Sequence, residues 1–191
     1  MAKIILASGS VIRKQMLEEA GLSFEVIVSN VDETPVEAYS LDDQLKDISM
    51  RKALAVMDKV RGNEDYIIVA ADQNILFNGT MYGKPNSIEE VRELIQSMSG
   101  SDQIYACVGN TVLHISNSKI ISHINEFDFS RLKMDVVSNE DLENYLATKS
   151  PLDKCAGINI DDAPFLHLER GKISTARGMT IEYLINMLSE I

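Results

Sequence analysis

The sequence predicts an α/β fold. A strand-like run at Lys3–Ala7 is followed by a helix-like segment, Arg13–Ala20, which stops at Gly21, and a second strand-like run follows at Phe24–Ser29. The 191 residues are 45% hydrophobic, which is enough for one compact domain or for two lobes that share a core. No repeat, linker or low-complexity segment interrupts the chain, so we expect a single domain over residues 1–191.

The middle of the chain continues this alternation. Asp42 and Asp43 lie where the dipole of a helix favours acids, and they start a predicted helix over Leu41–Val60. Ile67–Ala71 is typical of a buried strand, with Ile75–Phe77 as its continuation. The helix prediction rests on apolar residues at roughly helical spacing: Leu41, Leu45, Ile48, Leu54 and Val56.

Turn and cap residues predict the remaining elements. Asn78-Gly79 is typical of a hairpin turn into Thr80–Tyr82, and Ser87 caps a helix that runs toward Ser97. Ser116-Asn117-Ser118 favours a second hairpin. The other expected elements are strands at Gln103–Leu113, Lys119–Ile124 and Asp128–Val136, and helices from Asn139 to Thr148 and from Met179 to Ile191.

Composition excludes several function classes. The net charge is -11, from 18 basic and 29 acidic residues, which argues against binding to nucleic acid polymers or anionic membranes. The apolar start Ile4-Ile5-Leu6-Ala7 is too short for a secretory signal, and no run reaches membrane-spanning length. Cys107 and Cys155 form no CxxC pair, so we expect a cytoplasmic protein with reduced thiols, in which Cys155 is buried.

A possible phosphate-binding turn follows the first strand. Ser8-Gly9-Ser10 precedes a helix, so its N–H groups, its hydroxyls and the helix N-terminus could hold a phosphate, with Arg13 and Lys14 in the first turn. A capped strand-to-helix turn with solvent-facing cations would have the same sequence. The pattern is neither GxGxxG nor GxxxxGK[ST], so it supports neither a Rossmann nor a Walker loop.

Acids and lysines elsewhere add to this candidate site. Asp72 ends an apolar strand, where a partly buried carboxylate needs a hydrogen bond, a counter-ion or a metal. Glu33 lies on a turn after the second strand, and Lys84 lies on a Gly-Lys-Pro corner. Lys52 lies in the long helix, where basic residues usually face solvent. Together they suit hydrolysis of a nucleotide polyphosphate, with Glu33 and Asp72 as metal ligands and Arg13, Lys14, Lys52 and Lys84 as phosphate ligands.

The order of these motifs resembles the Maf family of nucleoside triphosphate pyrophosphatases. The similarity is collinear and covers most of the chain. The matching pieces are ILASGSVIRKQML at 4 to 17, FEVIVSNVDET at 24 to 34, RKALAV at 51 to 56, VAADQ, YGKP at 82 to 85, MSG at 98 to 100, FDFSRLKM at 127 to 134 and YLATKSPLDKCAG at 145 to 157.

This resemblance implies a fold shared with the inosine triphosphate pyrophosphatases, an elongated mixed β-sheet flanked by helices, with two lobes around a central cleft. It implies cleavage between the α and β phosphates, with release of a nucleoside monophosphate and pyrophosphate. A divalent cation, Mg²⁺ or Mn²⁺, and a homodimer are also implied. By position, Asp72 is the catalytic acid-base residue, and the phosphate and metal pocket comprises Ser8, Arg13, Glu33, Lys52 and Lys84.

Several positions bear on the choice of base. Two pieces resemble the family group that acts on 7-methyl-GTP: Asp72-Gln73 and Cys155-Ala156-Gly157. Members that act on dTTP and UTP usually have Asp-Thr in place of Asp72-Gln73. Ile12 stands where the 7-methyl-GTP group has Trp and the dTTP/UTP group has Arg, so it offers no cation–π contact. A glutamate expected after the Ala-Gly pair is replaced by Asp161 or Asp162. These positions together predict a modified, 7-methyl-GTP-like triphosphate as the substrate. The alternatives are a dTTP/UTP pyrophosphatase and a catalytically weak or inactive nucleotide-binding regulator linked to cell division.

Overall fold

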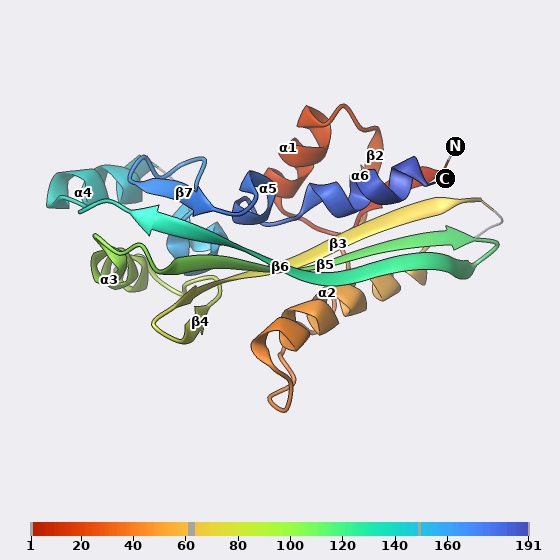
Figure 1. The fold of residues 1–191 in the computed structure, drawn as a ribbon, viewed down its shortest axis with the longest axis horizontal. Helices are drawn as coiled ribbons and strands as arrows, with labels where there is room; N and C mark the ends of the chain where they lie inside the picture. Colours follow the sequence, from red (N-terminus) through yellow and green to blue (C-terminus); the bar gives the residue numbers. More distant parts are fainter. Residues whose placement is uncertain (1, 61–63, 149, 191) are drawn as a thin grey trace. The chain divides into compact units, whose positions relative to one another are not determined.

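The computed structural model describes residues 2–60, 64–148 and 150–190, and it confirms the α/β prediction (Figure 1). Strands alternate with helices in the first half of the chain. In order, the elements are β1 (Lys3–Leu6), α1 (Val11–Glu19), β2 (Phe24–Val26), α2 (Leu41–Met57), β3 (Tyr66–Phe77), β4 (Thr80–Tyr82), α3 (Ile88–Met98), β5 (Ile104–Ser116), β6 (Lys119–Met134), α4 (Asn139–Thr148), the 3-10 helices η1 (Pro151–Asp153) and η2 (Cys155–Gly157), β7 (Leu166–Arg170), α5 (Ile173–Ala176) and α6 (Ile181–Ser189).

The strands form one mixed sheet. Within the described residues its order is β2-β1-β3-β5-β6-β7, and β4 pairs with β3. β1 runs parallel to both neighbours, with Ile5 opposite Glu25 on one side and Ile68 on the other. β4 is antiparallel to β3, and β7 is antiparallel to β6. The parallel pairs therefore come from the predicted β-α-β opening, since parallel neighbours need a crossover such as a helix.

The chain folds into two compact units. Unit 1 consists of Met1–Asp72, Val108–Asp128 and Gly178–Ile191, and unit 2 consists of Gln73–Cys107 and Phe129–Arg177. Strands β3, β5 and β6 each contribute residues to both units. In β3 the division falls between Asp72 and Gln73. The single domain and its cleft stay predictions.

Unit 1 has three layers, with α2 on one face of its strands and α1 and α6 on the other (Figure 1). Successive side chains of a strand point to opposite faces. In β1, Ile4 and Leu6 therefore pack in the cluster with α1 and α6, whereas Ile5 packs in the cluster with α2. In β3 the odd residues 67, 69 and 71 face α1 and α6, and the even residues 68 and 70 face α2. Burial on both faces explains the continuous apolar run in this strand.

Unit 2 has a separate apolar core. Helix α3 is capped by Ser87, whose hydroxyl accepts a hydrogen bond from the Glu90 N–H at 3.2 Å. The helix buries one stripe of residues that includes Val91 and Ile95. Tyr145 of α4 meets the Phe165 ring edge-on, with the ring centroids 5.4 Å apart. Its buried hydroxyl donates a hydrogen bond to the Gly157 carbonyl at 2.8 Å, which satisfies a polar group inside this core.

Several predicted boundaries are wrong. The segment 119–124 and most of the segment 128–136, predicted as two strands, belong to one strand, β6, whereas the predicted continuation of Ile67–Ala71 into Ile75–Phe77 is confirmed by β3. Strand pairing persists through the polar stretches because the backbone makes the ladder whatever side chain it carries. β2 ends at Val26 rather than at residue 29. The C-terminal helix spans Ile181–Ser189, and the predicted end at Ile191 lies outside the described residues. The sequence pattern predicts no helix at α5.

Both predicted hairpin turns are confirmed. β3 and β4 are joined by Asn78 and Gly79, with φ of 49° and 77°, and β5 and β6 are joined by Asn117 and Ser118, with φ of 50° and 60°. Two consecutive residues with positive φ match the twist of an antiparallel pair, and Asn and Gly tolerate that conformation best.

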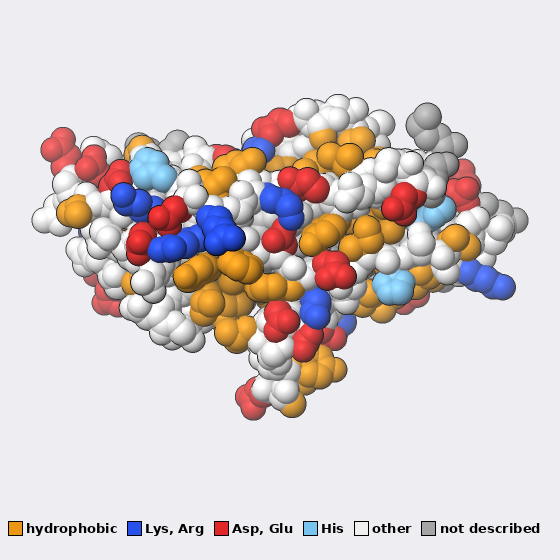
Figure 2. Space-filling view, viewed as in Figure 1, with side chains coloured by type: hydrophobic (Ala, Val, Ile, Leu, Met, Phe, Trp, Pro, Cys, Tyr) orange, Lys and Arg blue, Asp and Glu red, His pale blue; other side chains and the backbone are white. Residues whose placement is uncertain are grey.

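The surface mixes charges of both signs. On the face drawn in Figure 2, Lys and Arg side chains lie among Asp and Glu side chains. None of the helices in the described part of the chain combines the length and the apolar character that crossing a membrane requires.

Gly109 allows α2 to approach the sheet closely. A Cβ atom at this position would lie 2.2 Å from the backbone carbonyl of Leu45. We expect Gly109→Ala to destabilise the protein by about 1–3 kcal/mol, because helix and strand must separate to fit one methyl group. Urea unfolding followed by circular dichroism measures the change in the free energy of unfolding.

Gly9→Ala is the matched control. The nearest atom to a Cβ at Gly9 is Cγ2 of Val28 at 3.7 Å, an ordinary van der Waals contact. Equal losses of stability in the two variants would contradict the close approach at Gly109.

Candidate functional site

Asp72 is placed by the alternation of β3. Residues 68 and 70 of the strand face α2, so Asp72, two residues further on, faces the same way. Its side chain is only 14% exposed. A carboxylate at this depth needs a partner that compensates its lost hydration.

Helix α2 supplies that partner from the stripe that faces the sheet. Lys52 lies one turn before Val56 and two turns after Leu45, both of which are buried, and its own side chain is 8% exposed. Leu54, which the apolar spacing of the sequence includes, is 39% exposed. Lys52 therefore occupies a buried position of the helix rather than the solvent-facing one that a basic residue usually takes.

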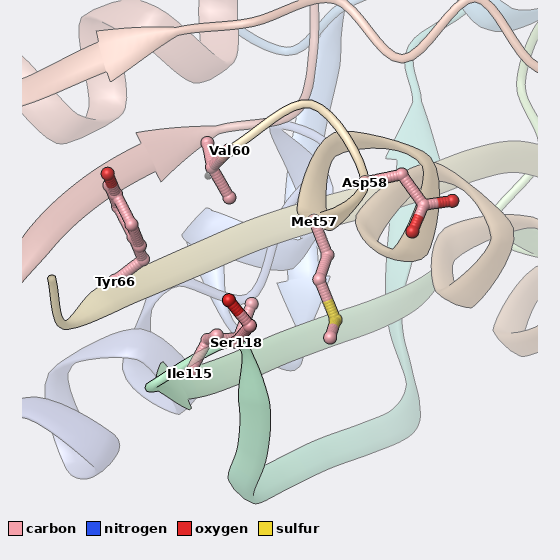
Figure 3. Close-up of a pocket in the computed structure, with 6 residues that line it drawn as sticks. All are labelled: Met57, Asp58, Val60, Tyr66, Ile115 and Ser118. Atoms are coloured by element: carbon pink, nitrogen blue, oxygen red, sulfur yellow. The ribbon is translucent and has the colours of Figure 1, made fainter. Parts of the chain in front are cut away.

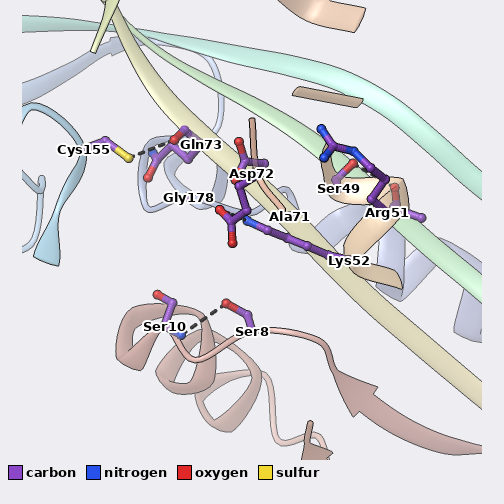
Figure 4. A network of polar contacts seen from close by, with 12 residues as sticks. Ser8, Ser10, Ser49, Arg51, Lys52, Ala71, Asp72, Gln73, Cys155 and Gly178 are labelled. Atoms are coloured by element: carbon purple, nitrogen blue, oxygen red, sulfur yellow. Dashed lines mark hydrogen bonds and ion pairs between the residues drawn. The ribbon is translucent and has the colours of Figure 1, made fainter. Parts of the chain in front are cut away.

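Lys52 joins two carboxylates. Its Nζ atom lies 2.6 Å from Oδ1 of Asp72 and 2.8 Å from Oε2 of Glu33. Figure 4 shows the ammonium group directed at Asp72. Glu33 is 56% exposed, so its carboxylate covers the solvent side of the lysine. The structure thus brings three of the predicted site residues together, in what we call the Glu33–Lys52–Asp72 cluster.

Arg51 holds the turn that carries Glu33. Its guanidinium donates hydrogen bonds to the carbonyl of Asp32 and, at 2.9 Å, to the carbonyl of Thr34, while its Nε donates to Asp47 at 2.9 Å. The sequence pattern assigns no such role to Arg51. Adjacent residues of a helix point about 100° apart. Arg51 therefore reaches the turn that carries Glu33, while its neighbour Lys52 reaches Asp72 on β3.

The turn at Ser8-Gly9-Ser10 is tied to the end of β3. Ser10 caps α1 by accepting from the Arg13 N–H, and Ser8 accepts from the Ser10 N–H at 3.2 Å (Figure 4). The Arg13 guanidinium donates to Ser8 at 3.1 Å and to the Ala71 carbonyl at 2.8 Å. Nε of the same arginine donates to the Gly178 carbonyl at 2.9 Å. Arg13 therefore fixes the serine turn against the residue that precedes Asp72.

Two other residues of α1 face away from this network. Lys14 is on the exposed side of the helix, with Nζ 3.7 Å from Glu18. Ile12 packs against the apolar cluster shared with α6. The packing of Ile12 gives it a core role, whatever it contributes to the choice of base.

Unit 2 gathers most of the positions that bear on the base. Gln73 donates from its side-chain amide to the Ala176 carbonyl at 3.2 Å, and its own carbonyl accepts from Sγ of Cys155 at 2.9 Å (Figure 4). The N–H of Ala156 donates to the carbonyl of Gly83 at 2.7 Å. This bond places the exposed Lys84 corner beside the Cys155-Ala156-Gly157 triplet. Cys155 is partly exposed, so the prediction of a buried thiol is wrong.

The acids predicted to read the base are paired with cations. Oδ2 of Asp162 lies 2.6 Å from Nζ of Lys154, and Oδ2 of Asp161 lies 2.7 Å from Nε of Arg177. The lysine of the first pair is 12% exposed and the arginine of the second is 15% exposed. Each carboxylate therefore has a counter-ion in a partly desolvated setting, where the attraction is stronger than in water.

Glu33 and Asp72 of this cluster carry the oxygen donors that a divalent cation such as Mg²⁺ prefers. Two carboxylate oxygens converge on one positive point, which is the donor type that Mg²⁺ and Mn²⁺ bind. Within the described ranges, no group of three or more His, Cys, Asp or Glu residues converges in this way. In nucleotide enzymes, Mg²⁺ is usually bound by one or two carboxylates, and phosphate and water supply its remaining ligands.

A small hollow in unit 1 is unrelated to these residues. It is lined by Met57, Asp58, Val60, Tyr66, Ile115 and Ser118 (Figure 3). The hollow lies at the C-terminal end of α2, more than one helical turn past Lys52 in sequence. Its lining includes none of the predicted site residues.

A lysine between two carboxylates and a capped serine turn beside the same strand are residue types that phosphate hydrolysis uses. The chain belongs to the Maf family: a family model described as Maf-like protein matches residues 3–191. Membership makes the chain an enzyme, a nucleotide pyrophosphatase, which confirms the prediction from the order of its motifs.

Relatives named as pyrophosphatases align with the whole chain. The chain is 34% identical over 194 residues to a dTTP/UTP pyrophosphatase of Bacillus thuringiensis, with 100% of this chain and 96% of the relative aligned. It is 33% identical, with the same coverage, to a dTTP/UTP pyrophosphatase of Bacillus anthracis. Among solved structures, a HAM1 protein from Coxiella burnetii aligns over 100% of both chains with 12% identity and a TM-score of 0.47.

The two cysteines should differ in reactivity. Burial raises the pKa of the Cys107 thiol to about 12, so almost none of it is thiolate at about pH 8, whereas Cys155 is partly exposed. We expect Ellman's reagent to label one thiol per native chain, and to label the second only after unfolding. Cys155→Ser should remove the native reaction. Two thiols that react at one rate in the native protein would contradict this assignment.

Proposed function

We propose that the chain hydrolyses a nucleoside triphosphate between its α and β phosphates and releases a nucleoside monophosphate and pyrophosphate. The observation that carries the proposal is the Glu33–Lys52–Asp72 cluster. Asp72 is held in a desolvated position on β3, where a carboxylate can accept a proton from an attacking water. Lys52 supplies a positive charge beside it for the phosphate oxygens.

The serine turn completes the phosphate site in this proposal. Ser8 and Ser10 stand at the N-terminus of α1, where the helix dipole favours an anion. Arg13 acts on this turn through its hydrogen bonds to Ser8 and Ala71, so it positions the turn relative to Asp72. Lys14 and Lys84 remain proposed phosphate ligands, and both are exposed to a substrate that arrives from solvent.

A divalent cation belongs to the proposed reaction. Glu33 and Asp72 would hold it, and it would neutralise charge on the phosphate oxygens. The chain's own residues do the rest: the carboxylate of Asp72 takes the proton, and Lys52 and the serine turn keep the triphosphate in line with the attacking water.

We propose dTTP or UTP as the substrate group. The acids that would attract a cationic methylated base are already paired, Asp162 with Lys154 and Asp161 with Arg177. A neutral pyrimidine needs no such charge. The two relatives named above are dTTP/UTP pyrophosphatases, which supports the same choice. Gln73 and the Cys155-Ala156-Gly157 triplet favour a second candidate, 7-methyl-GTP, as the sequence predicted.

The cytoplasmic location and the homodimer stay predictions from the sequence. A non-hydrolytic regulator of cell division would need the nucleotide but not the proton acceptor. The low exposure and pairing of Asp72 support the hydrolytic alternative.

A pyrophosphate-release assay distinguishes the substrate groups. With Mg²⁺ or Mn²⁺ present, we expect kcat/KM for dTTP and UTP to exceed that for 7-methyl-GTP and for GTP by about tenfold or more, the discrimination that one or two lost polar contacts produce. A preference for 7-methyl-GTP would establish the second candidate instead. If no triphosphate in the panel released pyrophosphate, the enzymatic proposal would fail.

Asp72→Asn tests the proposed proton acceptor. An amide keeps the size of the side chain but cannot take a proton, so kcat should fall by about 10²–10⁴-fold. Asp58→Asn, an exposed aspartate past the end of α2, is the matched control and should keep wild-type activity. Urea unfolding of both variants shows whether the fold survives. A folded Asp72→Asn protein with full turnover would refute the role.

A further inference from the structure

Lys52 occupies the point where the two carboxylates of the cluster converge. Its Nζ lies within hydrogen-bond distance of Asp72 and of Glu33 at the same time, and its side chain is 8% exposed. A metal ion that took the same two oxygens would lie where the ammonium group lies. The lysine and the metal would then compete for one place, because two positive charges there would repel each other in a partly desolvated setting.

We propose that Lys52 acts as a resident counter-ion that excludes divalent metal from the nucleotide-free enzyme, so that metal and triphosphate enter together. The inference rests on the proposed function and adds an order of binding to it. Lys52 is here a positioning and gating residue, in addition to its contact with phosphate.

The polyphosphate provides the negative charge that would draw the lysine away from the two carboxylates. Lys is a compact charge on a flexible four-carbon stem, so its ammonium can move without a shift of α2. An arriving triphosphate would offer anionic oxygens to Lys52, and Glu33 and Asp72 would then be available to hold the divalent cation that accompanies it. Each charge exchanges one partner for another, and none is left buried and unpaired.

The geometry explains why metal alone would bind weakly. Only two carboxylates converge among the described residues, and one of them, Glu33, is 56% exposed. Mg²⁺ and Mn²⁺ would have to expel Lys52 and gain two protein oxygens in return. Phosphate oxygens supply the missing ligands only when a nucleotide is present.

Mn²⁺ binding to the nucleotide-free protein tests the proposal. The loss of free-Mn²⁺ signal in electron paramagnetic resonance titrations gives the affinity. We expect Lys52→Met to bind Mn²⁺ at least about tenfold more tightly than wild type, because the competing ammonium is gone and both carboxylates remain. Lys46→Met is the matched control. Lys46 lies on the same helix and pairs with Asp43 at 2.7 Å, so its loss changes the net charge equally without opening the cluster.

Two outcomes would overturn the proposal: wild-type protein that binds Mn²⁺ as tightly as Lys52→Met, or a gain in Lys46→Met equal to that in Lys52→Met. If Lys52→Met fails to fold, the melting temperature of the wild-type protein with and without Mn²⁺ tests the proposal instead. We expect Mn²⁺ alone to give no saturable rise in Tm at concentrations that support turnover, since a ligand that does not bind the native state cannot stabilise it. A saturable rise would refute the gate and leave the hydrolytic function standing, whereas absence of pyrophosphate release refutes the function itself.

Discussion

The ion pair between Lys52 and Asp72 is the interaction on which the candidate site depends. Neither residue would be stable at its depth alone, because an unpaired charge in a partly desolvated place costs several kcal/mol. Together they join α2 to β3 with an N–O distance of 2.6 Å. Glu33 adds a second carboxylate to Lys52 from the solvent side, and Arg51 of the same helix fixes the turn that carries it. Helix α2 therefore carries Lys52 and fixes the turn of Glu33, whereas β3 places Asp72.

Two simple periodicities make this arrangement possible. The two-residue period of β3 turns Asp72 toward α2, and the 3.6-residue period of α2 turns Lys52 toward the sheet. Helix and strand must also be close enough for a lysine to reach an aspartate. Gly109 permits that approach, since a Cβ there would meet the backbone of Leu45. The charged cluster thus depends on a feature of the backbone far from it in sequence.

Much of this could be predicted from the sequence, and the failures have physical causes. The apolar run before Asp72 predicts a partly buried carboxylate correctly, because burial on both faces of a strand leaves a continuous apolar pattern. The buried position of Lys52 could not be predicted in the same way. A lysine interrupts the apolar spacing by which a buried helix face is recognised. The nearby Leu54 fits this spacing, so the pattern points to Leu54 rather than to Lys52 as the buried residue. The ion pairs of Asp161 and Asp162 could not be predicted from the sequence either, since the partners in an ion pair need not be close in sequence.

Asp72 and Gln73 show how neighbouring residues can serve different tasks. The aspartate contacts Lys52 of α2, whereas the glutamine contacts Ala176 and Cys155. Gln73 is held by hydrogen bonds to Ala176 and Cys155, and these bonds involve none of the ionised groups around Asp72. A change at residue 73 would therefore leave the ion pairs of Lys52 in place. In the proposed function, the residue that bears on the base and the residue that takes the proton are neighbours on one strand, so the choice of base would vary without loss of the Glu33–Lys52–Asp72 cluster.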